Sequence, residues 1–203
     1  MKVALIGASG ARGIKILAEL LNRGHDVTGI ARNPEKLAAQ PKLTAKKGDV
    51  SDEAGLAKLL AGHDAVISAV HFTAFDHKKL INTVKTSGVK RYIVVGGAGS
   101  LEVKPAVALI ETPEFPAAYK AEATSGYEYL KLLRGENDLE WTFLSPSAMI
   151  GPGTRTGTFR LGKDQLLVGS DGKSFISEED YAVALVDELE KPKHIRQRFT
   201  VGY

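Results

Sequence analysis

The chain has 203 residues, 43% hydrophobic and 25% charged, which is the composition of an ordinary soluble globular protein and excludes a disordered chain. Its 27 Lys and Arg residues are scattered among 24 Asp and Glu residues, and a net charge of +3 without a basic cluster argues against a nucleic-acid partner. No cysteine is present, which excludes disulfides and Cys-ligated zinc and is compatible with a cytoplasmic location. We expect one domain over residues 1–203, as a monomer or homodimer, without a membrane partner.

The first elements predict an alternation of strands and helices. The apolar run Lys2–Ile6 is far shorter than a membrane span and predicts a strand that Gly7 ends. Apolar residues at helical spacing follow over Gly13–Arg23, until Gly24 stops the helix. The same reasoning predicts further strands at Asp26–Ile30 and Leu43–Lys47 and helices at Pro34–Ala39 and Glu53–Leu60.

The alternation continues through the middle of the chain. We predict strands at Ala65–Ala69, Tyr92–Val95 and Trp141–Leu144 and helices at Lys78–Ser87 and Ala121–Leu133. Residues 101–118 contain three prolines and predict a long loop with one helical turn, of a length that is often functional in compact domains. The whole pattern predicts an α/β fold of Rossmann type, a doubly wound parallel sheet of six to seven strands.

Residues 151–203 have a different texture, which starts at Gly151-Pro152-Gly153. A helix is expected to begin near Ser177, because Ser177 and Asp180 have the spacing of a capping box. Arg198–Val201 predicts a final strand. We interpret residues 151–203 as a small cap on the substrate side of the same domain.

The loop between the first strand and the first helix carries the strongest functional signal. Gly7 permits a tight turn, Gly10 leaves room for a phosphate, and Gly13 lets the helix lie close to the strand. Small residues allow backbone N–H groups to approach a pyrophosphate at the positive end of the helix. The predicted dinucleotide loop consists of Gly7, Ser9, Gly10, Ala11, Arg12 and Gly13. The alternative is a glycine-rich turn without a ligand.

The choice of cofactor is expected about 20 residues beyond this loop, where an NAD-binding protein has Asp or Glu for the ribose hydroxyls. The sequence has Ala31-Arg32-Asn33 at this place. A guanidinium cannot accept those hydroxyl protons, but it suits the 2′-phosphate of NADP(H), which Arg12 could also reach. We therefore predict NADP(H) in preference to NAD(H). The alternative for Arg32 is a solvated surface charge.

Several segments resemble the atypical short-chain dehydrogenase/reductase superfamily, and the resemblance spans the whole chain. In the first half they are Gly7–Gly13, Arg32-Asn33-Pro34, Gly48-Asp49-Val50 and Ser68-Ala69-Val70. In the second half, Ser145-Pro146-Ser147, Gly151-Pro152-Gly153 and Ile176–Ala182 are similar to the branch of NADH-flavin or NAD(P)-dependent reductases. That branch is itself similar to biliverdin/flavin reductases and to NmrA-like cofactor sensors.

The resemblance also implies roles for single residues in an NAD(P)-binding Rossmann domain. Asp49 and Val50 would contact the adenine, Ser68, Ala69 and Val70 would line the cofactor, Gly96 and Gly97 would lie under the nicotinamide ribose, and Pro146 would flank the nicotinamide. These positions agree with the rule that ligands of open α/β sheets bind beyond the carboxyl ends of the strands. The alternative for Ser68 is a small residue tolerated at a strand end.

The best-known members of the superfamily use a Ser or Thr after strand five and a Tyr-x-x-x-Lys helix, in which the lysine lowers the pKa of the tyrosine. Tyr127 and Lys131 have this spacing, but they lie too close to the following strand. When the helix start is aligned instead, Lys120 takes the lysine position and Pro116 the tyrosine position, so the motif is broken. The catalytic residues stay unknown, with weak candidates at Tyr119, Lys120 and His71.

Two functions remain open. The first is an NAD(P)H-dependent oxidoreductase that reduces a flavin or another small planar acceptor, because hydride transfer mainly needs the two partners stacked in register. The second is a non-catalytic NmrA-like NADP(H)-binding redox sensor, which the broken motif favours. A sugar-nucleotide epimerase is disfavoured by the missing tyrosine, and no metal-ligand pattern is visible.

Four aromatic residues could form a wall for a planar acceptor, or instead fill the hydrophobic core of the loop. They are Phe72, Phe75, Phe115 and Tyr119.

Overall fold

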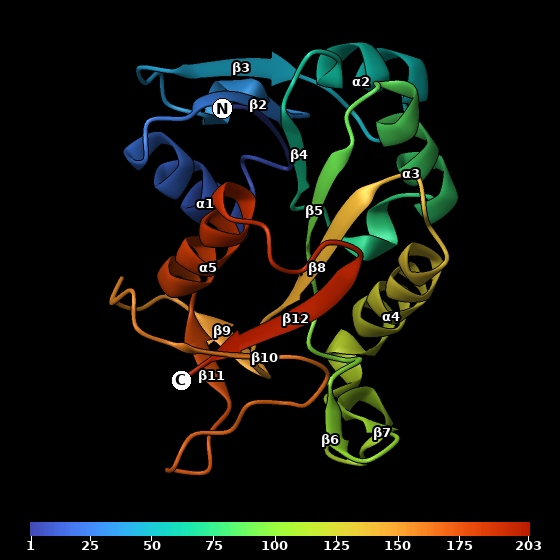
Figure 1. Ribbon diagram of the computed structural model, residues 1–203, viewed down its shortest axis with the longest axis vertical. Coiled ribbons are helices and arrows are strands. Elements are labelled where there is room, and N and C mark those ends of the chain that lie inside the picture. The colour runs from blue at the N-terminus through green and yellow to red at the C-terminus, as the bar shows by residue number, and fades with distance from the viewer.

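The computed structural model describes residues 1–203 and shows a central eight-stranded sheet with helices on both faces (Figure 1). The strands of this sheet are β1 (Lys2–Ile6), β2 (Asp26–Ala31), β3 (Leu43–Lys47), β4 (Ala65–Ser68), β5 (Arg91–Val95), β8 (Glu140–Ser145), β10 (Arg160–Gly162) and β12 (Gln197–Gly202). Their order across the sheet is β10-β12-β8-β5-β4-β1-β2-β3. All neighbouring pairs are parallel except the edge pair of β10 and β12. The predicted doubly wound parallel sheet is therefore confirmed, with eight strands in place of the six to seven expected, because the short edge strand β10 joins it.

The helices form two layers because alternate residues of the central strands point to opposite faces of the sheet. Val3 and Leu5 pack into the core under one layer, and Ala4 and Ile6 into the core under the other. The first layer consists of α1 (Ala11–Asn22) and α5 (Glu178–Glu190), and the second of α2 (Glu53–Leu60), α3 (His77–Thr86) and α4 (Lys120–Arg134). No helix combines the length and the apolar character needed to cross a membrane.

The predicted elements of the first half agree with the structure, with small shifts at their ends. Helix α1 begins two residues earlier than expected, at Ala11, because the extended backbone of Gly10 already forms its N-cap. The helix expected over Pro34–Ala39 is only one 3-10 turn, η1 (Pro34–Lys36). It ends there because Leu37 adopts an extended backbone and turns its side chain into the core under α1.

Several short elements lie where the sequence predicts loops. The stretch 101–118 contains a small hairpin of β6 (Glu102–Lys104) and β7 (Val107–Ala108) and the 3-10 turns η3 (Leu109–Glu111) and η4 (Ala117–Tyr119). A further turn, η2 (Phe72–Ala74), follows β4. Elements of two or three residues have no hydrophobic period, so sequence patterning cannot reveal them.

The range 151–203 is not only the expected small cap, because it is divided between the core layers and a small peripheral unit. Helix α5 packs along α1, and β12 pairs with β8 inside the main sheet. The remaining residues contribute β10 at the sheet edge and β11 (Phe175–Ser177), which pairs in parallel with β9 (Met149–Gly151). Figure 1 shows β9 and β11 close together beside the end of β12, where the C-terminus lies.

The single tryptophan, Trp141 on β8, belongs to the core under the layer of α2, α3 and α4. It is 2% exposed, and its indole N–H donates to the carbonyl of Glu136 at 3.2 Å. Nearby, the phenol oxygens of Tyr92 and Tyr129 are 2.8 Å apart in the same core. Because their polar atoms are paired, these large side chains can be buried without an unsatisfied donor.

Candidate functional site

A cavity of about 210 Å³ opens at the carboxyl ends of β1, β2 and β4. The chain crosses from β3, on one side of β1, to β4 on the other, so the cavity lies at the topological switch point where open α/β sheets bind ligands. Its lining brings together eight of the predicted cofactor contacts, Gly7, Ser9, Gly10, Arg32, Asp49, Val50, Ala69 and Val70. The candidate His71 and the small Ala74 also line it.

Two of the three glycines of the loop, Gly7 and Gly13, are required by close backbone approach. Gly7 has a positive φ of 81°, and a Cβ on it would lie 2.7 Å from the carbonyl oxygen of Ala69. A Cβ on Gly13 would lie only 2.1 Å from the carbonyl oxygen of Gly7. Gly10 differs from both, because its φ is −75° and a Cβ would meet only the Gly7 oxygen at 3.3 Å. Gly7 and Gly13 thus shape the loop, while Gly10 leaves the space above it open.

Unpaired donors converge at the start of α1. The backbone N–H groups of Ser9, Ala11, Arg12 and Gly13 donate to no other backbone group, and no side chain caps the helix. The first turn also contains no acidic residue. In addition, Nε of Arg12 is buried without a hydrogen-bond partner. Free N–H groups at the positive end of a helix bind anions, so this cradle fits a pyrophosphate.

Arg12 and Arg32 differ in their relation to the cavity. Arg32 follows β2 and lines the cavity, whereas Arg12 does not. Instead Arg12 lies near Tyr181 of α5, where burial raises the pKa of the phenol and the charge of Arg12 opposes this rise. The expectation that Arg12 reaches the same phosphate as Arg32 stays a prediction.

Asp49 lies on the far wall of the cavity, and its carboxylate accepts from the N–H (2.9 Å) and hydroxyl (2.7 Å) of Ser51. These hydrogen bonds lower the pKa of Asp49, and the positive charge of Arg32 adds to the effect. Arg32 is exposed and makes no ion pair with Asp49, so its guanidinium is free to meet a further anion.

The other predicted contacts lie outside the cavity. Ser68 is 2% exposed, and its hydroxyl lies close to the Tyr92 phenol in the core. Gly96 hydrogen-bonds through its N–H to the carbonyl of Leu144, and a Cβ on it would clash with the Phe143 ring at 2.4 Å. Gly97 and Pro146 follow β5 and β8, further along the same edge of the sheet. The roles of Ser68, Gly96, Gly97 and Pro146 stay predictions.

In the best-known members of the superfamily, the catalytic residues lie just after strand five and on the following helix. Here neither the segment after β5 nor α4 places an acid or a base in the cavity. Lys131 lies on the surface of α4, with its ammonium 4.6 Å from the ring centre of Tyr127 and 2.8 Å from Glu128. Tyr119 is 66% exposed and Lys120 is also exposed, and neither lines the cavity. The first hydroxyl after β5 is that of Ser100, which is buried and accepts from Arg198 at 3.2 Å.

Sequence reasoning missed Glu122, which fastens the segment after β4 to the first turn of α4. Its carboxylate accepts from the N–H groups of Phe72 (2.7 Å) and Thr73 (3.1 Å) and from the Thr73 hydroxyl (2.9 Å). Its Oε1 also lies 3.3 Å from Nδ1 of His71. Burial would raise the pKa of Glu122, but these hydrogen bonds outweigh burial and lower it. No local pattern announces a contact between residues about 50 positions apart.

The aromatic residues after β4 pack mainly into the hydrophobic core beneath this segment. The ring centres of Phe72 and Phe143 are 5.9 Å apart and nearly parallel, and Phe75 meets Tyr129 edge-on at 5.4 Å. His77 faces inward as well, with Nε2 at 3.0 Å from the Ser125 hydroxyl. Of the two histidines in this segment, only His71 faces the cavity.

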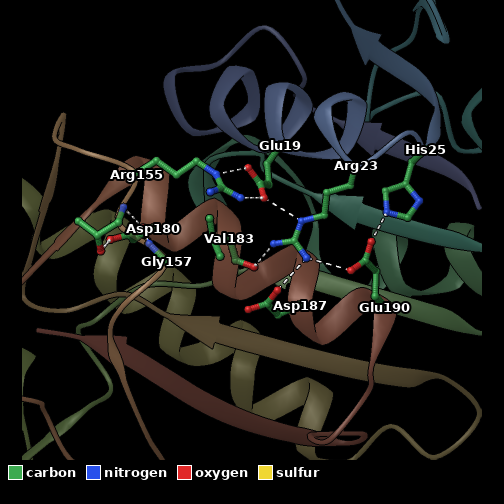
Figure 2. A network of polar contacts seen from close by, with 10 residues as sticks. Glu19, Arg23, His25, Arg155, Gly157, Asp180, Val183, Asp187 and Glu190 are labelled. Carbon is green, nitrogen blue, oxygen red and sulfur yellow. Dashed lines mark hydrogen bonds and ion pairs between the residues drawn. The ribbon is translucent and has the colours of Figure 1, made fainter.

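Carboxylates hold the segment 152–158 against α1 and α5, and Figure 2 shows part of this network. Asp180 is fully buried and accepts from the N–H groups of Thr156 and Gly157, both at 2.8 Å, and from the Tyr203 phenol at 2.7 Å. The guanidinium of Arg155 makes two hydrogen bonds of 2.8 Å to the buried carboxylate of Glu19, which also pairs with Arg23. Half of the expected capping box is present, because Ser177 accepts from the N–H of Asp180 while the Asp180 side chain turns to the segment.

A family model described as NAD(P)H-binding matches residues 7–192, which include the whole cradle and all but one residue of the cavity lining. The chain belongs to this NAD(P)H-binding family. The predicted relationship to NAD(P)-binding Rossmann proteins is thereby confirmed, and the cradle at the start of α1 is the feature of the structure that explains it.

Similar proteins cover nearly the whole chain. An uncharacterized protein of Bacillus subtilis, YwnB, is 43% identical over 99% of this chain and 98% of its own length. A structure from Bacteroides thetaiotaomicron, named a putative epimerase, is 43% identical with a TM-score of 0.95 and covers 100% of this chain and 96% of its own. A structure from Streptococcus pneumoniae, named a putative NADH-flavin reductase, is 37% identical with a TM-score of 0.87 and covers 100% and 99%. Their names point to more than one activity.

Proposed function

We propose that this protein is an NADPH-dependent reductase that passes a hydride to a small planar acceptor, with a flavin as the first candidate. The observation that carries the proposal is the pairing of an anion cradle at the start of α1 with Arg32 on the cavity wall beyond β2. The cradle suits the pyrophosphate, and Arg32 suits the 2′-phosphate that distinguishes NADPH from NADH. When bound, the cofactor supplies the hydride.

The rest of the proposed site follows the carboxyl edge of the sheet. Asp49 and Val50 would border the adenine, and Ala69 and Val70 the ribose, because all four line the same cavity as Arg32. The nicotinamide half would extend beyond β5 and β8, towards Gly97 and Pro146. The name of the Streptococcus pneumoniae neighbour supports a flavin as the acceptor, although it names NADH as the cofactor.

Arg32 provides the direct test of cofactor choice. Arg32→Ala should raise the Kd for NADPH about 10- to 100-fold, the range expected for a lost charge-assisted contact, and leave the Kd for NADH within about twofold. Gly10→Ala is the matched comparison, because a methyl group added in the cradle should weaken both cofactors alike. Binding is measured by titration with each cofactor. Tighter binding of NADH than NADPH by the wild type would contradict the role given to Arg32.

The surface position of Tyr127 and Lys131 favours a second candidate, a non-catalytic NADP(H)-binding redox sensor. The two functions are separated by following the absorbance of NADPH after addition of FMN, FAD or a quinone. Oxidation that depends on both protein and acceptor supports the reductase. Tight binding of NADPH without turnover of any acceptor would contradict the reductase and support the sensor.

A further inference from the structure

His71 is the one imidazole of the cavity wall. The ionisable residues among the lining are Arg32, Asp49 and His71. A guanidinium stays protonated, and the hydrogen bonds from Ser51 that lower the pKa of Asp49 keep that carboxylate ionised. An imidazole, in contrast, gains and loses a proton in the neutral range.

The segment that begins with His71 borders both halves of the proposed site. On one side it lines the cavity beside the cradle. On the other, the ring of its neighbour Phe72 lies 3.7 Å from the position that a Cβ on Gly97 would take, just beyond β5. The His71 side chain is 77% exposed, so both an acceptor and water can reach its ring.

Glu122 gives the ring a defined orientation. Its Oε1 faces Nδ1 of His71, while both of its oxygens hold the backbone of the next two residues. With a hydrogen on Nδ1 directed to the carboxylate, Nε2 is the nitrogen left for proton exchange. The other charged residue at the start of α4 is Lys120, which is exposed and makes no ion pair with either residue.

We propose that His71 is the proton donor of the reduction and that Glu122 is its positioning residue, a step that rests on the proposed reductase function. The hydride brings two electrons and one hydrogen from NADPH to the acceptor. Nε2–H of His71 supplies the proton that completes the reduced acceptor, and the neutral ring regains a proton from water. A carboxylate against Nδ1 stabilises the protonated ring that this step consumes.

Substitutions of His71 test the donor directly. His71→Gln should lower kcat for quinone reduction by NADPH about 100-fold, and any loss of NADPH affinity from the altered cavity wall should be much smaller. Imidazole added to His71→Ala should restore part of the rate. His63→Gln is the control, because the His63 ring contacts Thr28 and the Leu60 carbonyl away from the cavity. This variant should keep the wild-type rate.

Glu122 is tested by a readout that needs no turnover. In ¹⁵N NMR of the protein without cofactor, the neutral His71 ring should carry its hydrogen on Nδ1, and Glu122→Gln should shift it towards Nε2. The same variant should lower kcat about 10-fold, with partial recovery in Glu122→Asp. An unchanged tautomer in Glu122→Gln would overturn the positioning role even if the variant were less stable.

The outcomes separate this proposal from the reductase itself. Full kcat in His71→Gln, or a loss confined to NADPH binding, would overturn the donor role while leaving a working reductase. A wild-type protein that binds NADPH and turns over neither flavin nor quinone would overturn the reductase, and the proton step with it.

Discussion

Two stretches of chain lie against the helix α1, and they are held there by different means. The Gly7–Gly13 loop is held by backbone approach, with no room for a Cβ on Gly7 or Gly13. The segment 152–158 is held by side chains, through the carboxylates of Glu19, Glu179 and Asp180. The first arrangement depends on steric contact and should not respond to pH, whereas the second should weaken in acid.

The largest effect is expected where the steric contact is tightest. Gly13→Ala places a Cβ 2.1 Å from the Gly7 oxygen, which neither backbone can avoid without separating α1 from β1. We expect the free energy of unfolding to fall by roughly 4 kcal/mol, at the upper end of overpacking effects. Denaturant unfolding measures it.

Gly10→Ala is the matched control for this prediction. Its backbone φ of −75° suits any residue, and its nearest contact is 3.3 Å, so stability should change by less than about 1 kcal/mol. The added methyl group would occupy the open space of the cradle and reduce cofactor affinity. Equal loss of stability in both variants would remove the distinction between a loop-shaping and a ligand-facing glycine.

The next effect concerns Asp180, the buried anchor of the segment 152–158. Asp180→Asn removes the charge and cannot accept all the bonds from Thr156, Gly157 and Tyr203. We expect a loss of about 2–3 kcal/mol in the free energy of unfolding, because a buried network is left partly unpaired. Chemical denaturation at neutral pH measures the loss.

The pH dependence gives the same anchor a second test. Burial would raise the pKa of Asp180, but its hydrogen bonds outweigh burial and lower it. A carboxylate with a lowered pKa contributes stability above its unfolded pKa of about 4, and this contribution is lost as the pH falls through the folded value. Wild type and Asp180→Asn should therefore differ at pH 7 and converge in acid. A constant difference down to pH 3 would contradict the ionic role.

The smallest effect on stability is expected at the exposed side chain of the segment 152–158, Arg155. Arg155 is half exposed, and its hydrogen bonds are the main cause that lowers the pKa of Glu19. Because Glu19 keeps Arg23 as a partner, Arg155→Ala should cost less than about 1 kcal/mol. Raised salt should shrink the difference further, and a salt-independent loss would indicate packing of the arginine stem instead.

The contrast between a loop held by backbone contact and a segment held by side chains also explains what the sequence could predict. A steric requirement selects glycine at fixed spacing, so the loop, the strand before it and the helix after it are visible in the residues themselves. Arg32 was equally visible, because its position is counted from that loop. The segment 152–158 is held by partners about 24 and 136 positions away, and no local pattern records such contacts.

The same limit applies to the candidate site. The adenosine side could be predicted because backbone geometry and strand ends define it, and eight predicted residues do line one cavity. The direction of a side chain could not be predicted, because Ser68 turns into the core beside Tyr92. Glu122 was missed because its partners belong to the turn η2, which is distant in sequence from α4 and packs against it.

The isolated indole of Trp141 gives this molecule an optical reporter of its own. Reduced nicotinamide absorbs light where a buried indole emits, so NADPH held at the carboxyl edge of the sheet should quench this one fluorophore by energy transfer. No second tryptophan confuses the signal. The ring also lies in the core between the sheet and α4, so a red shift of its emission would report loss of packing, while quenching without a shift would report an occupied site.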